Sequence, residues 1–312
     1  MRAENHTPAQ ATAPGRVSPG PSAGVAPDAG VSAAPGAGAG RKPLDAAGLA
    51  RALLRPGGLW QAVEVVDRTG STNADLLARA LGGAPEGVLL AAEEQSAGRG
   101  RMGRAWVSPP RAALTFSLLV HPAAVPPARR GWLPLLAGVA VATAVTAVTG
   151  VQTRLKWPND VLTGPAKLAG ILAEAAGGAV VVGVGLNVST GPGELPPAGP
   201  GALAATSLRI AISEGAASAA PDREPLLIAI LAGFERWYRA WCRAGGDPER
   251  SGLRAGYTEL SGTIGRRVRA ELPGGQVLSG PAVGVDPDGR LLVRVSSGTV
   301  VPVAAGDVVH LR

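Results

Sequence analysis

Large apolar residues are distributed unevenly along this chain of 312 residues. Residues 1–43 consist mainly of Ala, Gly, Pro and Ser and show no apolar periodicity, whereas regular apolar patterns begin near Leu44. A segment with so few large apolar side chains cannot bury enough surface to offset the entropy lost on ordering. We therefore predict a disordered tail over 1–43, followed by a folded part that is long enough for one large domain or two smaller ones.

Apolar periodicity divides the folded part near residue 262. Before this point, runs with period 2 alternate with helical patterns. The predicted strands cover 62–67, 88–93, 114–120, 153–157, 168–174 and 179–188, and the predicted helices cover 45–55, 72–81, 133–148 and 225–243. Residues 263–312 instead hold five short strands separated by strong turn signals, which is typical of a small β-barrel.

Composition restricts the class of protein further. The net charge of +7 suggests a polyanionic partner such as a nucleotide, and arginine is scattered rather than concentrated in a tail. The single cysteine, Cys242, excludes an intrachain disulfide and suits a reducing cytosol. Residues 131–153 carry no charge, but they are rich in small residues and contain Pro134, so we predict a buried core helix and not a membrane span.

The segment Gly98-Arg99-Gly100-Arg101-Met102-Gly103-Arg104-Ala105-Trp106 is the most informative motif. Its glycines let the backbone approach a ligand closely, and its three arginines repel one another unless an anion neutralises them. Trp106 offers a stacking face or a lid. We expect a loop that is mobile when empty and ordered by an anionic nucleotide. A solvated basic loop or an RNA-binding segment is the alternative.

Polar residues gather again in Lys156-Trp157-Pro158-Asn159-Asp160, at the end of a predicted strand. Lys156 suits a phosphate, Asn159 a polar ligand edge, and Asp160 either Mg²⁺ or a proton. An ordinary turn with a capping Asn or Asp is the alternative.

Three further motifs are ambiguous individually. Lys167 enters an apolar strand, where a buried ammonium needs an anion, although a lysine at a strand edge can also serve to prevent aggregation. Gly170 on the same strand indicates close approach of another group to the backbone. Gly183-Val184-Gly185-Leu186-Asn187-Val188 is either a ligand-facing or a packed strand. Gly70-Ser71-Thr72-Asn73 precedes a helix, and Thr72 with Asp75 matches a capping box.

Taken in order, these five motifs closely resemble the biotin–protein ligase family over about residues 65–312. The resemblance implies an α+β fold. A class II synthetase-like catalytic domain, with a mixed sheet and flanking helices, would cover 44–262, and a small SH3-like β-barrel would cover 263–312.

The resemblance also implies roles for individual residues. Ser71, Thr72, Asn73 and Gln95 would contact biotin, and the arginine loop would close over biotin and the adenylate. Lys167, Arg101 and Asp160 would act in catalysis, with no metal site made by the protein alone. The full set of expected binding residues is Ser71, Thr72, Asn73, Gln95, Gly98, Arg99, Gly100, Arg101, Arg104, Trp106, Lys156, Asn159, Lys167, Gly170, Gly185 and Asn187.

The activity implied by the resemblance has two half-reactions. ATP, biotin and Mg²⁺ would give biotinyl-5'-AMP, and a lysine of a biotin carboxyl carrier protein would then take the biotin. The resemblance further suggests a cytoplasmic monomer or weak homodimer. Residues 1–43 and 44–60 cannot form the winged helix-turn-helix that some family members carry, so no DNA binding is expected.

Three alternatives stay open at this stage. A lipoate or octanoyl ligase or transferase shares the catalytic fold, although the arginine loop and the Lys156–Asp160 motif favour biotin. A nucleic-acid-binding module would use the arginine loop and the barrel, but the aromatic content of 3% offers few stacking residues. A membrane protein would use the uncharged stretch over 131–153.

Overall fold

The computed structural model describes Met1 and residues 40–199, 203–213, 220–272, 275–304 and 306–311. Most of the predicted tail over 1–43 lies outside the described residues. Within the described part of this segment, Arg41 contacts the folded part, with 2.6 Å between its guanidinium Nη2 and Glu194 Oε2.

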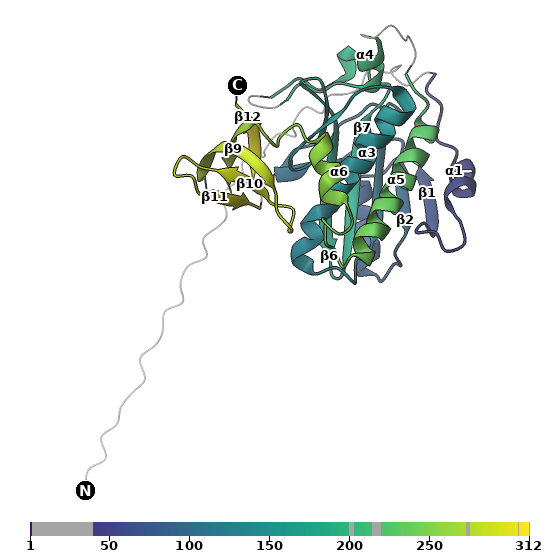
Figure 1. Ribbon diagram of the computed structural model, residues 1–312. Helices are drawn as coiled ribbons and strands as arrows, with labels where there is room; N and C mark the ends of the chain where they lie inside the picture. Colours follow the sequence, from purple (N-terminus) through teal and green to yellow (C-terminus); the bar gives the residue numbers. More distant parts are fainter. Residues whose placement is uncertain (2–39, 200–202, 214–219, 273–274, 305, 312) are drawn as a thin grey trace. The chain divides into compact units, whose positions relative to one another are not determined.

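The larger sheet has seven strands in the order β1-β2-β3-β7-β6-β5-β4 (Figure 1). β1 pairs parallel to β2, and every other neighbouring pair is antiparallel, so the sheet is mixed as predicted. The strands are β1 (Ala62–Val66), β2 (Val88–Ala92), β3 (Ala113–Val120), β4 (Arg154–Lys156), β5 (Asp160–Thr163), β6 (Ala166–Ala176) and β7 (Ala179–Asn187).

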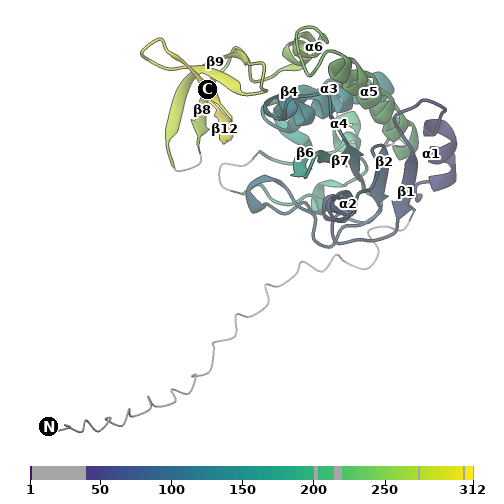
Figure 2. The same ribbon diagram turned by 90° about the horizontal axis from the view of Figure 1, so that it is seen from below.

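Helices cover both faces of this sheet (Figure 2). α2 packs on one face, against β2, β3, β6 and β7, while α3 packs on the other face, against β4 to β7 and against α5. The α-helices are α1 (Ala46–Leu53), α2 (Thr72–Leu81), α3 (Trp132–Thr149), α4 (Leu208–Ser213), α5 (Arg223–Arg243) and α6 (Leu253–Leu260), and the 3₁₀ turns are η1 (Arg101–Gly103), η2 (Pro127–Gly131) and η3 (Pro192–Glu194).

α3 explains the uncharged stretch. Within the described residues, the segment Pro127–Thr149 is long and apolar enough to cross a bilayer. However, α3 is covered by the sheet on one side and by α5 and α6 on the other, and most of its side chains are buried. A helix that is apolar all round is typical of the interior of a large domain. The prediction of a core helix is therefore confirmed.

The C-terminal strands form a separate antiparallel sheet in the order β11-β10-β9-β8-β12. They are β8 (Arg267–Glu271), β9 (Val277–Val285), β10 (Leu291–Arg294), β11 (Val300–Val303) and β12 (Asp307–His310), close to the five predicted strands. Two indoles join this sheet to the larger domain. Trp132 Nε1 donates to the carbonyls of Asp286 and Pro287, and Trp157 Nε1 donates to Gly289 O at 3.0 Å.

The structure corrects three local predictions. β5 was missed, because the motif ending at Asp160 is the turn of a hairpin and not the end of an isolated strand. α4 and α6 were missed as well. The helix cap is Ser71 and not Thr72, since Ser71 has extended backbone angles and its Oγ accepts from Ala74 N. Thr72 begins the helix, and its hydroxyl bonds to Gln95.

Thr263 and His310 join the last strand to the β4–β5 hairpin. Thr263 Oγ1 accepts from Trp157 N at 3.0 Å and lies 3.0 Å from His310 Nε2. Burial, together with the positive charges of Lys156 and Arg266, lowers the pKa of His310 to about 4. Because the hydroxyl hydrogen of Thr263 is available for His310 Nε2, this contact suits a neutral imidazole.

We expect the stability of the protein to depend on His310 in mildly acidic solution. The folded pKa lies below the ordinary value of about 6.5, so the unfolded chain binds the proton more readily. The contribution of His310 is therefore fully present above pH ~6.5 and is lost as the pH falls toward ~4. Melting temperatures should fall more steeply over this range for the unaltered protein than for His310→Gln. Parallel curves for the two proteins would contradict the assignment.

Candidate functional site

A cavity of about 840 Å³ opens between the larger sheet, the arginine loop and β12. It is lined by all the predicted site residues except Gly98. These are Ser71, Thr72, Asn73, Gln95, Arg99, Gly100, Arg101, Arg104, Trp106, Lys156, Asn159, Asp160, Lys167, Gly170, Gly185 and Asn187. Residues that are more than one hundred positions apart in the sequence therefore share one cavity, and their roles in it remain predictions.

One end of the cavity is a buried polar network at the start of α2. Gln95 Oε1 accepts from both the backbone N and the hydroxyl of Thr72, at 2.7 and 3.0 Å. Asn73 Nδ2 donates to Glu174 Oε2 at 2.7 Å, and Ser117 Oγ lies 2.6 Å from Asn73 Oδ1. Each of these side chains is fixed by its neighbours, so this end offers a preorganised polar surface to a ligand.

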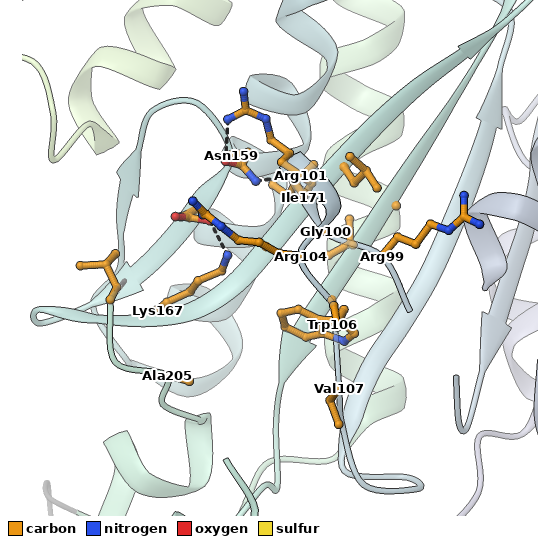
Figure 3. A pocket seen from close by; sticks show the side chains of 18 of the residues that line it. Arg99, Gly100, Arg101, Arg104, Trp106, Val107, Asn159, Lys167, Ile171 and Ala205 are labelled. Carbon is orange, nitrogen blue, oxygen red and sulfur yellow. Dashed lines mark hydrogen bonds and ion pairs between the residues drawn. The ribbon is translucent and has the colours of Figure 1, made fainter. Parts of the chain in front are cut away.

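The arginine loop folds back on itself. Gly100 N donates to Arg104 O at 2.6 Å, and Trp106 N donates to Gly98 O at 2.9 Å. Met102 has φ 57° at the tip of the turn. In Figure 3, the side chains of Arg101 and Arg104 extend toward Asn159 and Lys167, whereas Arg99 extends away from them. Only two of the three loop arginines therefore join the cationic group around Lys167.

Gly98 has a structural role. A Cβ atom at this position would lie 2.4 Å from Trp106 O and 2.7 Å from Gln95 Nε2. The missing side chain thus allows the two arms of the loop to approach each other, even though Gly98 does not line the cavity.

Trp106 packs on a pair of glycines. Gly170 and Gly185 face each other across β6 and β7. A Cβ atom at Gly185 would lie 2.3 Å from Trp106 Cε2, and one at Gly170 would lie 3.6 Å from Trp106 Cζ3. The two glycines therefore make a flat area of sheet on which the indole rests.

Lys167 forms an ion pair with Asp160, with 2.7 Å between Nζ and Oδ1. Lys156 Nζ lies 4.0 Å from the other oxygen of the same carboxylate. Asp160 is thus held between two ammonium groups, and both side chains of the Lys167–Asp160 pair are partly shielded from water.

An irregularity in β6 directs Lys167 into the cavity. The register with β5 shifts, so that Val161 faces Ala169 while Leu162 faces Lys167. Without this β-bulge, Lys167 and Gly170 would lie on opposite faces of a strand, whereas both line the cavity here. A Cβ atom at Gly170 would lie 3.1 Å from Lys167 Nζ, so the glycine leaves room for the lysine.

Two asparagines fix backbone segments beside the cavity. Asn159 Nδ2 donates to Ile171 O at 3.0 Å, and its Oδ1 accepts from Arg101 Nη1 at 3.3 Å. Asn187 Nδ2 donates to Thr206 O at 2.9 Å, next to the point where Thr206 N donates to Lys167 O. These amides hold the arginine loop and the 203–206 segment against the sheet.

The charges that line the cavity favour an anion. Among the described residues, six cationic side chains line it, whereas the lining carboxylates are two, Asp160 and Glu271. The cations are Arg99, Arg101, Arg104, Lys156, Lys167 and Arg269. Such an excess in a partly enclosed space concentrates positive potential, which suits a phosphate or a carboxylate.

Several lining residues were not anticipated from the sequence. Thr115 lines the cavity from β3, and Ser117 joins the polar network two positions further on the same face. Two polar residues spaced by two within an apolar strand were an available signal. Arg269, Glu271 and His310 come from the C-terminal sheet, and no local pattern connected them with this site.

Comparison with known proteins gives consistent matches. Residues 65–190 match the Biotin/lipoate A/B protein ligase family, and residues 263–311 match the Biotin protein ligase C terminal domain. Biotin--[acetyl-CoA-carboxylase] ligase of Mycobacterium tuberculosis is 49% identical over 276 residues, which is 87% of this chain and 97% of that protein. Bifunctional ligase/repressor BirA of Bacillus subtilis is 35% identical over 220 residues, or 69% of this chain and 64% of that protein.

A solved structure matches the fold. Biotin protein ligase from Aquifex aeolicus in complex with biotin and ATP has a TM-score of 0.63 and 25% identity, covering 81% of this chain and 98% of the other. The mixed sheet, the flanking helices and the small C-terminal sheet thus define a protein ligase. The chain belongs to the biotin protein ligase family, so the resemblance noted in its five motifs is confirmed.

The contact between Trp106 and Gly185 gives a test of the closed loop. In Gly185→Ala, the new methyl group would overlap the indole, so the indole must leave the glycine pair and loosen the loop. Overpacking of this kind costs ~1–3 kcal/mol, which corresponds to an open population about five- to a hundredfold larger. Limited trypsin cleavage at the loop arginines should therefore accelerate by about the same factor. Gly178→Ala is the matched control, because nothing lies within 4 Å of its added Cβ. Equal cleavage of both variants would contradict the packing.

Proposed function

We propose that the chain forms biotinyl-5'-AMP from biotin and ATP and transfers the biotin to a lysine of a biotin carboxyl carrier protein. The single observation that carries the proposal is the shared cavity, in which a fixed polar end and a cationic end are continuous. Biotin has a polar ring system at one end and a carboxylate at the other, which correspond to the two ends of such a site. The names of the relatives from M. tuberculosis and A. aeolicus support biotin and ATP as the substrates.

Binding of biotin would use the buried end of the cavity. Thr72, Asn73 and Gln95 offer hydroxyl and amide groups there, and Phe116 with Val184 supplies apolar surface. The carboxylate of biotin would then point toward Lys167. A carboxylate held beside an ammonium in a shielded site needs no reorganisation of solvent before it reacts.

In the first half-reaction, a carboxylate oxygen of biotin attacks the α-phosphorus of ATP, and pyrophosphate leaves. Negative charge increases on the non-bridging α-phosphate oxygens and on the leaving group. Lys167 would stabilise the α-phosphate oxygens, while Arg101 and Arg104, which extend to the same side, would bind the phosphates. Lys156 and Asn159 would hold the nucleotide at the β4–β5 turn.

In the second half-reaction, the amine of the carrier lysine attacks the carbonyl carbon of the mixed anhydride, and AMP leaves. The amine has to lose a proton, and Asp160 is the carboxylate nearest the expected reaction centre. Trp106 and the closed loop would exclude water, which would otherwise hydrolyse the anhydride.

Mg²⁺ would accompany the phosphates of ATP. The described residues contain no group of three or more His, Cys, Asp or Glu side chains that could hold a metal. We expect the ion to be bound mainly by substrate phosphates and waters, with at most one or two protein carboxylates such as Asp160. Bound Mg²⁺ would neutralise charge on the leaving pyrophosphate.

Labelling of a carrier domain tests the function directly. The protein should attach biotin to a biotin carboxyl carrier domain only when ATP is present, and lipoate in place of biotin should give no product. Lys167→Ala should reduce the rate by about 10²- to 10³-fold, which is typical for loss of one charged stabilising group. Lys42→Ala is the control, because Lys42 is exposed and does not line the cavity. Labelling that is equal for both variants, or ATP-dependent lipoate attachment, would contradict the proposal.

The assignment of Asp160 as base can be separated from its contact with Lys167. We expect Asp160→Asn to slow transfer from preformed biotinyl-5'-AMP by about 10²-fold, in the range typical of general-base catalysis. Biotin-dependent exchange of pyrophosphate with ATP reports on adenylate formation alone. If exchange falls while transfer is unchanged, Asp160 orients Lys167 and is not the base.

A further inference from the structure

The segment 94–110, which contains the arginine loop (98–106), leaves the sheet after β2 and returns to it before β3 at nearly the same point. Glu93 follows β2, and Arg111 precedes β3, so both stand at the ends of the segment 94–110. Arg111 N donates to Glu93 O at 2.9 Å, which closes the base of the loop. Arg111 has φ 59°, a left-handed conformation that is unusual for a residue other than glycine. Strained backbone of this kind persists only where surrounding contacts hold it.

A buried ion pair lies at this base. The guanidinium of Arg223, the first residue of α5, meets the carboxylate of Glu93 through two contacts, Nη1–Oε2 at 2.6 Å and Nη2–Oε1 at 3.2 Å. Both side chains are more than nine-tenths buried. Such a bidentate ion pair fixes the relative orientation of the two side chains as well as the distance between them.

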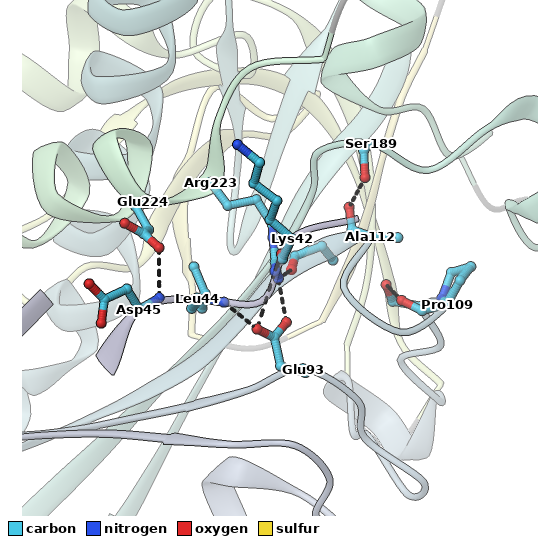
Figure 4. Close-up of polar contacts among 11 residues, drawn as sticks. Lys42, Leu44, Asp45, Glu93, Pro109, Ala112, Ser189, Arg223 and Glu224 are labelled. Carbon is cyan, nitrogen blue, oxygen red and sulfur yellow. Dashed lines mark hydrogen bonds and ion pairs between the residues drawn. The ribbon is translucent and has the colours of Figure 1, made fainter. Parts of the chain in front are cut away.

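The same pair reaches the far end of the loop and a third segment of the chain. Arg223 Nη1 also donates to Ala113 O at 3.2 Å, just past Arg111, and Nη2 donates to Lys42 O at 2.6 Å. Glu93 Oε1 accepts from Leu44 N at 2.6 Å. As Figure 4 shows, the backbone of 42–44 passes over the pair and contacts both partners.

The Glu93–Arg223 ion pair acts on the position of the loop more than on the overall stability. A buried ion pair adds little net stability to a fold, because the loss of hydration of the two charges offsets most of their attraction. Its effect is on position, since Arg223 also donates to Ala113 O beyond one end of the loop, while Glu93 stands at the other end and accepts from Leu44 N. Neither side chain lines the cavity, so neither touches a ligand there.

We propose that Glu93 and Arg223 are positioning residues, which clamp both ends of the arginine loop and thereby hold it closed over the acyl-adenylate. The inference rests on the proposed function for its ligand, but not for its geometry. With the clamp intact, only the tip of the loop has to move when substrates enter. Without the ion pair, segment 94–110 would shift as a whole, and Arg101 and Trp106 would leave their positions beside the cavity.

The test compares three variants. Glu93→Gln breaks the pair and leaves a buried guanidinium without a counter-charge, which destabilises the fold by itself. The double variant Glu93→Gln/Arg223→Met removes both charges, and such exchanges are often neutral for stability. Glu235→Gln is the matched control, because Glu235 is a buried carboxylate on α5 that accepts from Leu59 N at 2.9 Å and from Arg239 Nε at 2.9 Å, away from the cavity.

The double variant should keep a melting temperature close to that of the control. Its release of biotinyl-5'-AMP in the absence of acceptor, and its KM for biotin, should rise by about tenfold, in line with the larger open population of the loop. The rate of transfer at saturating adenylate should change much less. Release and KM equal to those of Glu235→Gln would overturn the proposal.

Two measurements do not depend on the reaction. Trypsin should cut the loop arginines about tenfold faster in the double variant than in Glu235→Gln. In the unaltered protein, the amides of Leu44 and Arg111 should exchange hydrogen far more slowly than those at Met102 and Gly103. If all four amides exchange equally fast, the proposal that the ion pair holds the ends of the loop is wrong, whatever the variants show. If the unaltered protein forms no biotinyl-5'-AMP, the proposed function fails, and the clamp is judged by cleavage and exchange alone.

Discussion

Repulsion among like charges is the constraint around which this site is organised. Six cationic side chains line one cavity with two carboxylates, so the charge is only partly balanced within the protein. Lys167 is held by Asp160, and Arg101 contacts Asn159. A bound acyl-nucleotide would complete the balance with its phosphate.

Absent side chains shape the cavity as much as the charged ones do. A Cβ atom at Gly183 would lie 2.1 Å from Asn73 Oδ1, and one at Gly185 would overlap Trp106. These two glycines of β7 therefore admit a polar group from α2 and an aromatic group from the loop onto neighbouring parts of one strand. The sheet provides a smooth surface because its central strands carry no side chain at the points of contact.

The sequence was informative where a function depends on local composition. The arginine loop, Lys167 and the core helix α3 were predictable, because glycine, charge and apolar periodicity each have a direct structural meaning. β5 was not predictable, since it has only four residues and begins directly at the turn, so it shows no apolar pattern of its own. Arg223 and His310 were beyond reach for a different reason: their partners lie 130 and 47 residues away, and only the folded backbone brings them into contact.

The contacts of β12 have a consequence for the order in which the protein becomes competent. His310 reaches Thr263, which in turn holds Trp157 N, one residue after Lys156. During synthesis, the ribosome makes β12 after every other described element, so the seven-stranded sheet can be complete while the hairpin beside the cavity still lacks its support. A nascent chain would thus have a folded larger domain before the wall of the cavity is complete, and the β4–β5 hairpin would gain its last support only after β12 is made.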